Sequence, residues 1–116
     1  MKKKNLAKKK NLKSLFSTIK INNKNFKNRI ISSPISINMA EDGYVTKNII
    51  NFFSNLSKSG VSMVTIGAAS VSNQGSDTKN GMIVGQQKYL KKLKNLSKII
   101  KSNNSLSSLQ IFHVGA

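Results

Sequence analysis

An uninterrupted run of small and β-branched residues, Val61 to Ala69, lies between two segments with helical spacing of their apolar residues. Such a run is typical of a strand buried on both faces in a parallel sheet. Parallel strands need long crossover connections, and a helix is the usual one. The run and its flanks therefore predict an α/β fold in which strands and helices alternate.

The segment before this run has the pattern of an amphipathic helix. Its apolar positions recur at i, i+4 and i+7, namely Ile49, Phe53 and Leu56. Thr46 is a candidate N-cap, because its hydroxyl oxygen can accept a hydrogen bond from the first turn. Gly60 is the candidate stop, since glycine tolerates the left-handed conformation that ends many helices.

The segment after the run predicts a second amphipathic helix with a basic outer face. The apolar residues repeat at i, i+4, i+7 and i+11: Tyr89, Leu93, Leu96 and Ile100. Lysines fall mainly on the opposite side: Lys91, Lys92, Lys94, Lys98 and Lys101. The simpler interpretation of these lysines is a solvated helix surface, and a binding patch is the alternative.

Two more strands complete the pattern. The first covers residues 29–33 and ends at Pro34, which has no N–H for a strand ladder. A hairpin with its polar turn at residues 22–25 precedes it. The second covers Leu106 to Val114, and residues 70–85 are expected to form a polar loop.

The order hairpin, strand, helix, strand, helix, strand implies a parallel sheet with right-handed crossovers. Three consecutive strands of a (β/α)8 barrel fit this order, and a small doubly wound sheet fits the periodicity equally well. A complete barrel needs roughly 250 residues, so a chain of 116 residues holds only part of one. The last residues, Gln110 to Ala116, resemble the end of a barrel strand running into an active-site loop.

The charge balance is strongly basic, with 20 Lys and Arg against 3 Asp and Glu and a formal net charge of +17. Such a surplus suggests nucleic acid, an anionic membrane or an acidic ligand. AT-rich codon usage is the competing cause, because 19 of the 20 cations are Lys and Asn occurs 15 times. Residues 1–13, which repeat a Lys-Lys-Lys-Asn-Leu unit, are expected to form a disordered basic tail, with a nucleic-acid-binding arm as the alternative.

Several classes of function lack their sequence signals. Without cysteine there is no disulfide framework or thiol nucleophile, which fits a reduced cytoplasm. The N-terminal lysines are not followed by a signal-peptide apolar run, and no stretch approaches the ~20 residues that span a bilayer. The single histidine, His113, and the acids Glu41, Asp42 and Asp77 have no metal-ligand spacing, so no metal site is expected. Nucleophile-elbow, P-loop and G-x-G-x-x-G motifs do not occur.

Small or polar residues stand at the expected carboxyl ends of the three strands: Ser33-Pro34-Ile35-Ser36, Gly67-Ala68-Ala69 and Gln110. In a parallel barrel these ends meet at one mouth, where ligands bind. Small residues there allow a flat ring system to approach the backbone, and Ser36 and Gln110 can supply oriented hydrogen bonds. We therefore predict a ligand site at these ends.

These residues also carry a resemblance to a known family. From residue 14 to residue 116 the chain resembles the N-terminal part of the Old Yellow Enzyme family of FMN-dependent NAD(P)H:flavin oxidoreductases and ene-reductases. It is most similar to the branch of the dienoyl-CoA reductases and bacterial NADH oxidases. The matching segments occur in family order: Leu15-Phe16 to Ile21, Lys27 to Ile30, Ser33-Pro34, Asn38 to Thr46, Gly60-Val61, Ala68 to Val71, Gln74-Gly75 and Gln110 with His113-Val114-Gly115.

The resemblance implies a partial FMN-binding TIM (β/α)8 barrel domain over residues 14–116, about three βα units after a leading hairpin, with FMN as cofactor and NAD(P)H as electron donor. Ser33, Pro34, Ile35 and Ser36 match the first-strand turn whose main chain lies against the isoalloxazine ring. Ala68 matches the small residue beside that ring, and Gln110 matches the amide that binds the flavin's polar edge. His113 belongs to the third-strand motif without an assigned proton transfer, and the catalytic residues stay unknown.

The chain departs from the family at three positions. Asn38 replaces a Tyr found in some branches, and Ser76 and Ala116 stand where Arg is common. The family's substrate-binding His pair, later Arg and phosphate-binding loops lie beyond the third strand. We therefore expect a flavin-binding segment with little turnover alone. The alternatives are a basic nucleic-acid-binding module and a non-catalytic remnant that folds only with a complementary chain, the missing barrel half.

Overall fold

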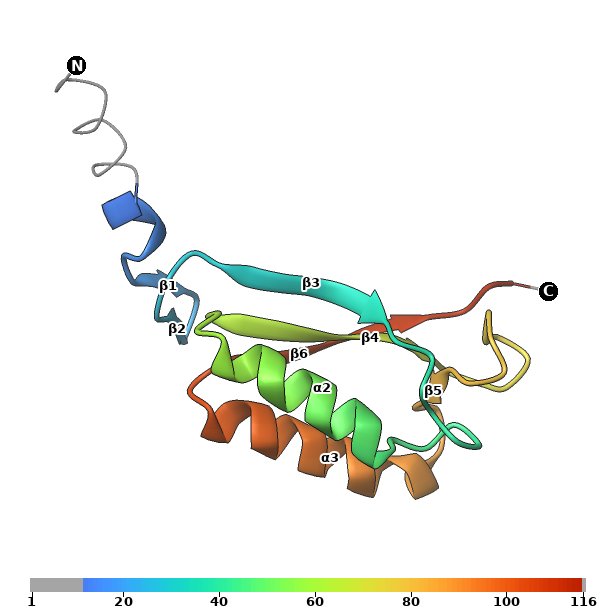
Figure 1. Ribbon diagram of the computed structural model, residues 1–116. Helices are drawn as coiled ribbons and strands as arrows, with labels where there is room; N and C mark the ends of the chain where they lie inside the picture. Colours follow the sequence, from blue (N-terminus) through green and yellow to red (C-terminus); the bar gives the residue numbers. More distant parts are fainter. Residues whose placement is uncertain (1–11, 116) are drawn as a thin grey trace, which may run out of the picture.

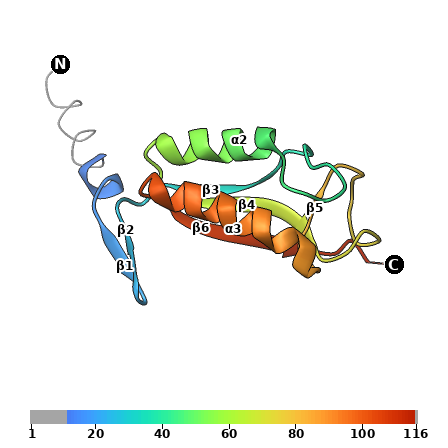
Figure 2. The same cartoon turned by 90° about the horizontal axis from the view of Figure 1, so that it is seen from below.

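A computed structural model describes residues 12–115, which form a sheet with two helices packed on it and a small hairpin at one end (Figures 1 and 2). Residues 12–15 make one helical turn. The elements that follow are β1 (Ile19–Ile21), β2 (Lys24–Phe26), β3 (Ile31–Ser36), α2 (Lys47–Lys58), β4 (Met63–Ser70), β5 (Met82–Ile83), α3 (Gln87–Ser102) and β6 (Leu106–Phe112). Most of the predicted tail, residues 1–11, lies outside the described residues.

Strand β4 is the centre of the four-stranded sheet. It pairs in parallel with β6 from Met63 opposite Leu106 to Ser70 opposite Phe112, with an irregularity between Ile66 and Ala69. Its other edge pairs in parallel with β3 and then, at its last two residues, with β5. All three neighbours therefore run in the direction of β4, and their carboxyl ends lie at the same end of the sheet.

The two crossover helices lie on the same face of this sheet (Figure 2). Helix α2 connects β3 to β4, and α3 connects β4 to β6, so the order of the main strands in the sheet follows their order in the chain. A doubly wound sheet reverses its strand order and carries helices on both faces. Strands in chain order with both helices on one face are the arrangement of part of a TIM barrel, and the reversal of strand order that marks a doubly wound sheet does not occur among the described residues.

The core lies between β4 and the two helices. On β4, Val64, Ile66 and Ala69 are at most 3% exposed and face the helices. The alternating residues Met63 and Thr65 are only half-buried. The prediction that both faces of this strand are buried therefore holds for the helix-covered face alone, because no described element covers the other.

Both predicted helices are confirmed. The Thr46 side chain caps α2 by accepting a hydrogen bond from the N–H of Ile49 at 3.4 Å, and Gly60 adopts a φ of +95° just after the helix. In α3 the four predicted apolar positions are buried, at most 8% exposed, and the five outer lysines are exposed. The spacing of apolar residues was sufficient to predict both helices, because each has one face covered by the sheet and one face in solvent.

Strand limits differ from the predictions in four places. Pro34 does not end its strand but lies inside β3, at a register irregularity between Ser32 and Ile35. There it interrupts no regular ladder, because bulges and edge strands tolerate a missing N–H. The hairpin turn is only Asn22-Asn23, since residues 24–26 pair as β2. The predicted loop at residues 70–85 contains the short strand β5. The last strand ends at Phe112, two residues before the predicted end at Val114.

Candidate functional site

The predicted site residues lie at the carboxyl ends of β3, β4 and β6. Ser36 is the last residue of β3, Ala68 lies near the end of β4, and Gln110 lies two residues before the end of β6. Because the strands are parallel, these residues share one end of the sheet, where barrel enzymes bind their ligands.

Ser36 and Ala68 are directly joined. The hydroxyl oxygen of Ser36 accepts a hydrogen bond from the backbone N–H of Ala68 at 3.1 Å. The proton of that hydroxyl makes no hydrogen bond with any residue between 12 and 115. It is therefore available to an acceptor atom on a ligand.

Pro34 and Gln110 approach Gly67 from the two neighbouring strands. A Cβ atom added at Gly67 would lie 2.5 Å from Cβ of Pro34 and 3.1 Å from Oε1 of Gln110. Only glycine allows β4 to come this close to both side chains. The sequence indicated Gly67 only as one of the small residues at this strand end and not as a flavin contact, although a glycine inside a strand-like run is a known sign of close backbone approach.

The register of β4 also shifts here. Its pairing with β6 is irregular between Ile66 and Ala69, so the regular alternation of side chains is interrupted at Gly67 and Ala68. Such irregularities re-aim side chains and are frequent beside binding sites. The small residues of β4 are thus placed where the chain departs from an ordinary strand.

The predicted site residues form a surface that is open on the side of the sheet away from the helices. Ser33, Pro34, Ser36 and Gln110 are exposed, and Ala68 is half-buried. Ile35 is 45% exposed, but it pairs with Ile66, whose side chain lies in the core. Residues paired across strands point to the same face, so the main chain of Ile35, and not its side chain, is the part that faces the open side.

His113 connects the end of β6 to the loop after β4. Its imidazole packs against Gly75, where a side chain would overlap the ring. The N–H of Val114 donates to the carbonyl of Gly75 at 3.1 Å, and the N–H of Gly115 donates to Nδ1 of His113 at 3.0 Å. These contacts give His113 a structural role within the described residues.

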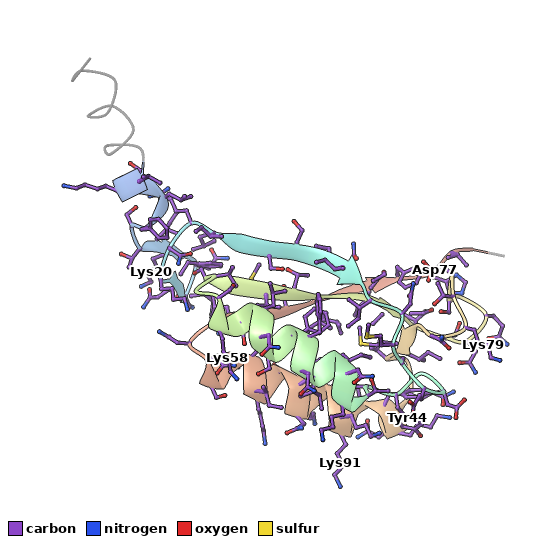
Figure 3. All side chains as sticks on the ribbon, viewed as in Figure 1. Lys20, Tyr44, Lys58, Asp77, Lys79 and Lys91 are labelled. Carbon is purple, nitrogen blue, oxygen red and sulfur yellow. The ribbon has the colours of Figure 1, made fainter. Side chains whose placement is uncertain are left out.

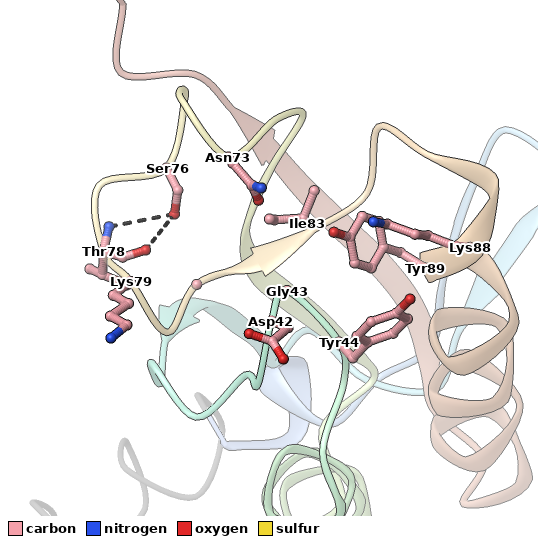
Figure 4. A pocket seen from close by; sticks show the side chains of 11 residues that line it. Asp42, Gly43, Tyr44, Asn73, Ser76, Thr78, Lys79, Ile83, Lys88 and Tyr89 are labelled. Carbon is pink, nitrogen blue, oxygen red and sulfur yellow. Dashed lines mark hydrogen bonds between the residues drawn. The ribbon is translucent and has the colours of Figure 1, made fainter.

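A second feature of the same end is a cavity of about 390 Å³ beyond β3 and β4 (Figure 4). The loop before α2, the loop after β4 and the first turn of α3 enclose it. Side chains that line it include Asp42, Tyr44, Asn73, Lys79, Lys88 and Tyr89. It contains none of the predicted flavin residues, and the sequence carried no motif that would have pointed to it.

In the described part of the chain, lysines project from several elements, and the exposed lysines of α3 share its outer face. Lys20 projects from the hairpin, Lys58 from the end of α2, Lys79 from the loop after β4 and Lys91 from the outer face of α3 (Figure 3). Between residues 12 and 115, no group of three or more His, Cys, Asp or Glu residues comes together as a metal site. No helix in this part of the chain is long and apolar enough to cross a membrane.

Comparison with protein families shows which family the chain resembles over most of its length. Residues 14–116 match the model of the NADH:flavin oxidoreductase / NADH oxidase family. The sequence matches none of the curated proteins with which it was compared.

Several solved structures share the fold. A 2-naphthoyl-CoA reductase in complex with 2-naphthoyl-CoA is 26% identical with a TM-score of 0.85, over 89% of this chain and 16% of that one. Old Yellow Enzyme from Pichia sp. AKU4542 is 18% identical with a TM-score of 0.81, over 88% and 27%. Morphinone reductase in complex with tetrahydroNAD is 15% identical with a TM-score of 0.79, over 88% and 28%. The chain thus spans between 16% and 28% of the length of these three proteins.

Proposed function

Because the chain belongs to the NADH:flavin oxidoreductase / NADH oxidase family, we propose that residues 14–116 form part of the FMN cradle of an NAD(P)H-dependent flavin oxidoreductase. Members of this family bind FMN and take electrons from NAD(P)H. The observation that carries the proposal is the convergence of three strand ends on Gly67, with Ser36, Ala68 and Gln110 around it.

The residues present fit a flavin. Gly67 and Ala68 leave a face without bulky side chains, which suits the close approach of a planar ring. The free hydroxyl proton of Ser36 suits a flavin carbonyl oxygen, and the exposed amide of Gln110 suits the donor and acceptor atoms of the ring's polar edge.

Each residue has a distinct role in this proposal. The main chain of Ser33 to Ser36 holds the ring from the side of β3, and Gln110 orients it from β6. Ala68 keeps the space against the ring small enough to exclude water. FMN, when bound, accepts a hydride from NAD(P)H and passes it to an activated alkene or another acceptor.

The cradle is incomplete by itself. The exposed side chains of Leu109 and Ile111, at 37% and 57%, lie on β6, and β3 and β6 each pair with one strand only in the described part of the chain. Unpaired strand edges and exposed apolar side chains favour association with further polypeptide. We propose that further barrel segments, in the same or a separate chain, cover these edges and supply most of the catalytic residues.

Two further expectations belong to this proposal. The domain is proposed to cover residues 14–116, with the basic segment 1–13 outside it, and the protein is proposed to work in the cytoplasm. The lack of cysteine supports a reducing compartment. Among residues 12–115 the alternative of a nucleic-acid-binding module is supported only by the exposed lysines on the outer face of α3, which a solvated helix surface explains equally well.

Flavin fluorescence tests the cradle. Titration of FMN with the chain should quench and polarise the flavin fluorescence. Gln110→Ala should weaken FMN binding by about tenfold, because the polar edge of the flavin ring would lose a hydrogen-bond partner. Asn95→Ala on the exposed surface of α3 is the matched control and should bind as the parent chain does. Equal binding by Gln110→Ala and the parent would contradict the proposed cradle.

Co-expression with the remaining barrel strands tests whether further segments complete the domain. The chain with the remaining strands of a family barrel should form a stable complex that oxidises NADH, whereas the chain alone should show little NADH oxidation with FMN. Robust oxidation by the chain alone would refute this part of the proposal, and so would failure to form any complex.

A further inference from the structure

Asn80 is the one asparagine of the chain that precedes a glycine, in the sequence Lys79-Asn80-Gly81. In such a pair the backbone nitrogen of the second residue can attack the side-chain amide carbon of the first. Glycine has no side chain to hinder this attack and leaves the backbone free to adopt the geometry it needs. The sequence therefore marks one position where a side-chain amide can be lost, and its surroundings decide whether the folded chain allows the reaction.

The side chain of Asn80 is free to move. Asn80 lies in an exposed turn of the loop that joins β4 to β5. Its amide group makes no hydrogen bond with any residue between 12 and 115. The side chain can therefore rotate toward the following backbone nitrogen, and water reaches both groups.

The backbone N–H of Gly81 is held only weakly. It donates to the carbonyl oxygen of Thr78 at 3.4 Å, beyond the usual length of about 2.9–3.0 Å. The same carbonyl oxygen accepts a shorter hydrogen bond, of 2.8 Å, from the hydroxyl of Ser76 (Figure 4). Because Ser76 already satisfies this carbonyl, the nitrogen of Gly81 can leave it at little cost.

The peptide group between Asn80 and Gly81 is also activated from its other side. Its carbonyl oxygen accepts a hydrogen bond from the N–H of Ala40 at 2.9 Å. Ala40 is only 3% exposed, and a hydrogen bond is electrostatically stronger away from water. Because this bond draws electron density toward the oxygen, the nitrogen of the same peptide group loses its proton more easily.

We propose that Asn80 is a site of spontaneous deamidation in the folded chain. The deprotonated nitrogen of Gly81 attacks Cγ of Asn80, the bond from Cγ to Nδ2 breaks, and ammonia leaves behind a succinimide ring. Water then opens this ring at either of its two carbonyl carbons. One opening gives aspartate, and the other gives isoaspartate, in which the main chain runs through Cγ. No oxidant, reductant or enzyme takes part.

Isoaspartate at this position changes how two loops are joined. The hydrogen bond between Ala40 and Asn80 connects the loop before α2 with the loop after β4. Three residues further on, the N–H of Ile83 in β5 donates to the carbonyl of Gly43 at 3.0 Å. Isoaspartate adds one atom to the main chain between these two contacts, so both cannot keep their geometry. The modification therefore loosens β5 and the loop before α2.

Mass spectrometry of the 116-residue chain tests the reaction. The folded chain is incubated in water enriched in ¹⁸O and digested, and the peptide that contains residue 80 is sequenced. This peptide should lose the amide nitrogen, take up ¹⁸O and contain both aspartate and isoaspartate. The rate should rise with pH, because the attacking nitrogen must lose its proton. Gly81→Ala should slow the reaction by about tenfold, since a Cβ atom restricts the backbone, and Asn80→Gln should show none on the same time scale.

Asn104 is the matched internal control. It is exposed and precedes another small residue, Ser105, which is only 4% exposed, and it should keep its amide. Equal loss of amide at Asn80 and Asn104, or reaction at Asn80 only after unfolding in urea, would overturn the proposal.

Hydrogen exchange tests the structural consequence. The backbone amides of Ala40 and Ile83 should exchange faster in the isoaspartyl chain than in the unmodified chain. Unchanged exchange at both amides would contradict the loosening of the two loops. None of these outcomes depends on whether the chain binds FMN.

Discussion

The hydroxyl oxygen of Ser36 accepts a hydrogen bond from the backbone N–H of Ala68 at 3.1 Å, across the junction of β3 and β4. This junction lies where the pairing of β4 with its neighbours departs from a regular ladder. A side-chain hydroxyl thus satisfies a main-chain donor and at the same time keeps its own proton for a ligand. One small residue therefore connects the stability of the sheet end with the proposed flavin cradle.

Ser36→Ala should lower the free energy of unfolding by about 1 kcal/mol, the usual net contribution of one hydrogen bond. It should also weaken FMN binding, because the donor to the ring is lost. Ser36→Thr keeps the hydroxyl and should preserve both properties. Urea unfolding and FMN titration of the three proteins measure the two effects, and an Ala variant with unchanged stability would contradict the role of this bond.

Gly67→Ala should destabilise the chain by about 1–3 kcal/mol, because the added methyl group would force the Pro34 side chain and β4 apart. Gly81→Ala is the comparison. There the nearest atom to an added Cβ is Oγ of Ser76 at 2.6 Å, a loop hydroxyl whose movement costs only its local hydrogen bonds with Thr78. Thermal unfolding should therefore show the larger loss for Gly67→Ala, and equal losses would mean that the close approach to Pro34 is not required.

Asn28 joins the end of the hairpin to the α2–β4 turn and is only 6% exposed. Its side-chain amide donates to the carbonyl of Gly60 at 2.8 Å, and its Oδ1 accepts from the N–H of Ile30 at 3.0 Å. Asn28→Ala should cost about 1–3 kcal/mol, since both main-chain groups lose their partner. Asn25→Ala, at an exposed position of β2, should have little effect on the urea midpoint. Similar midpoints for the two variants would contradict this role.

Ile111→Lys should raise the highest concentration at which the chain remains monomeric. Ile111 is 57% exposed on β6, and a lysine on an unpaired strand edge opposes edge-to-edge association. Light scattering as a function of concentration measures the effect. The unfolding temperature should change little, because no packed core contact is lost. Unchanged association would indicate that self-association uses another surface.

The sequence alone determined the elements that have a regular pattern. The apolar spacing of α3 and the cap and stop of α2 at Thr46 and Gly60 are local properties of ten to sixteen residues, so the chain itself reveals them. The run that became β4 was equally clear. The partial barrel and the flavin family were expected from the resemblance, and the family match over residues 14–116 confirms that family.

Only the tertiary structure decided how distant residues meet. Pro34 and Gln110 lie 76 positions apart in the chain, and no local pattern places them on either side of Gly67. The position of Pro34 inside β3 and the short strand β5 likewise depend on pairing with β4. Tyr89 was predicted as a core residue of α3, which it is, but only the fold places it beside Asp42 and Lys79 in the lining of one cavity. Periodicity records which face of an element is covered, whereas the fold decides what covers it and which polar atoms remain free at its ends.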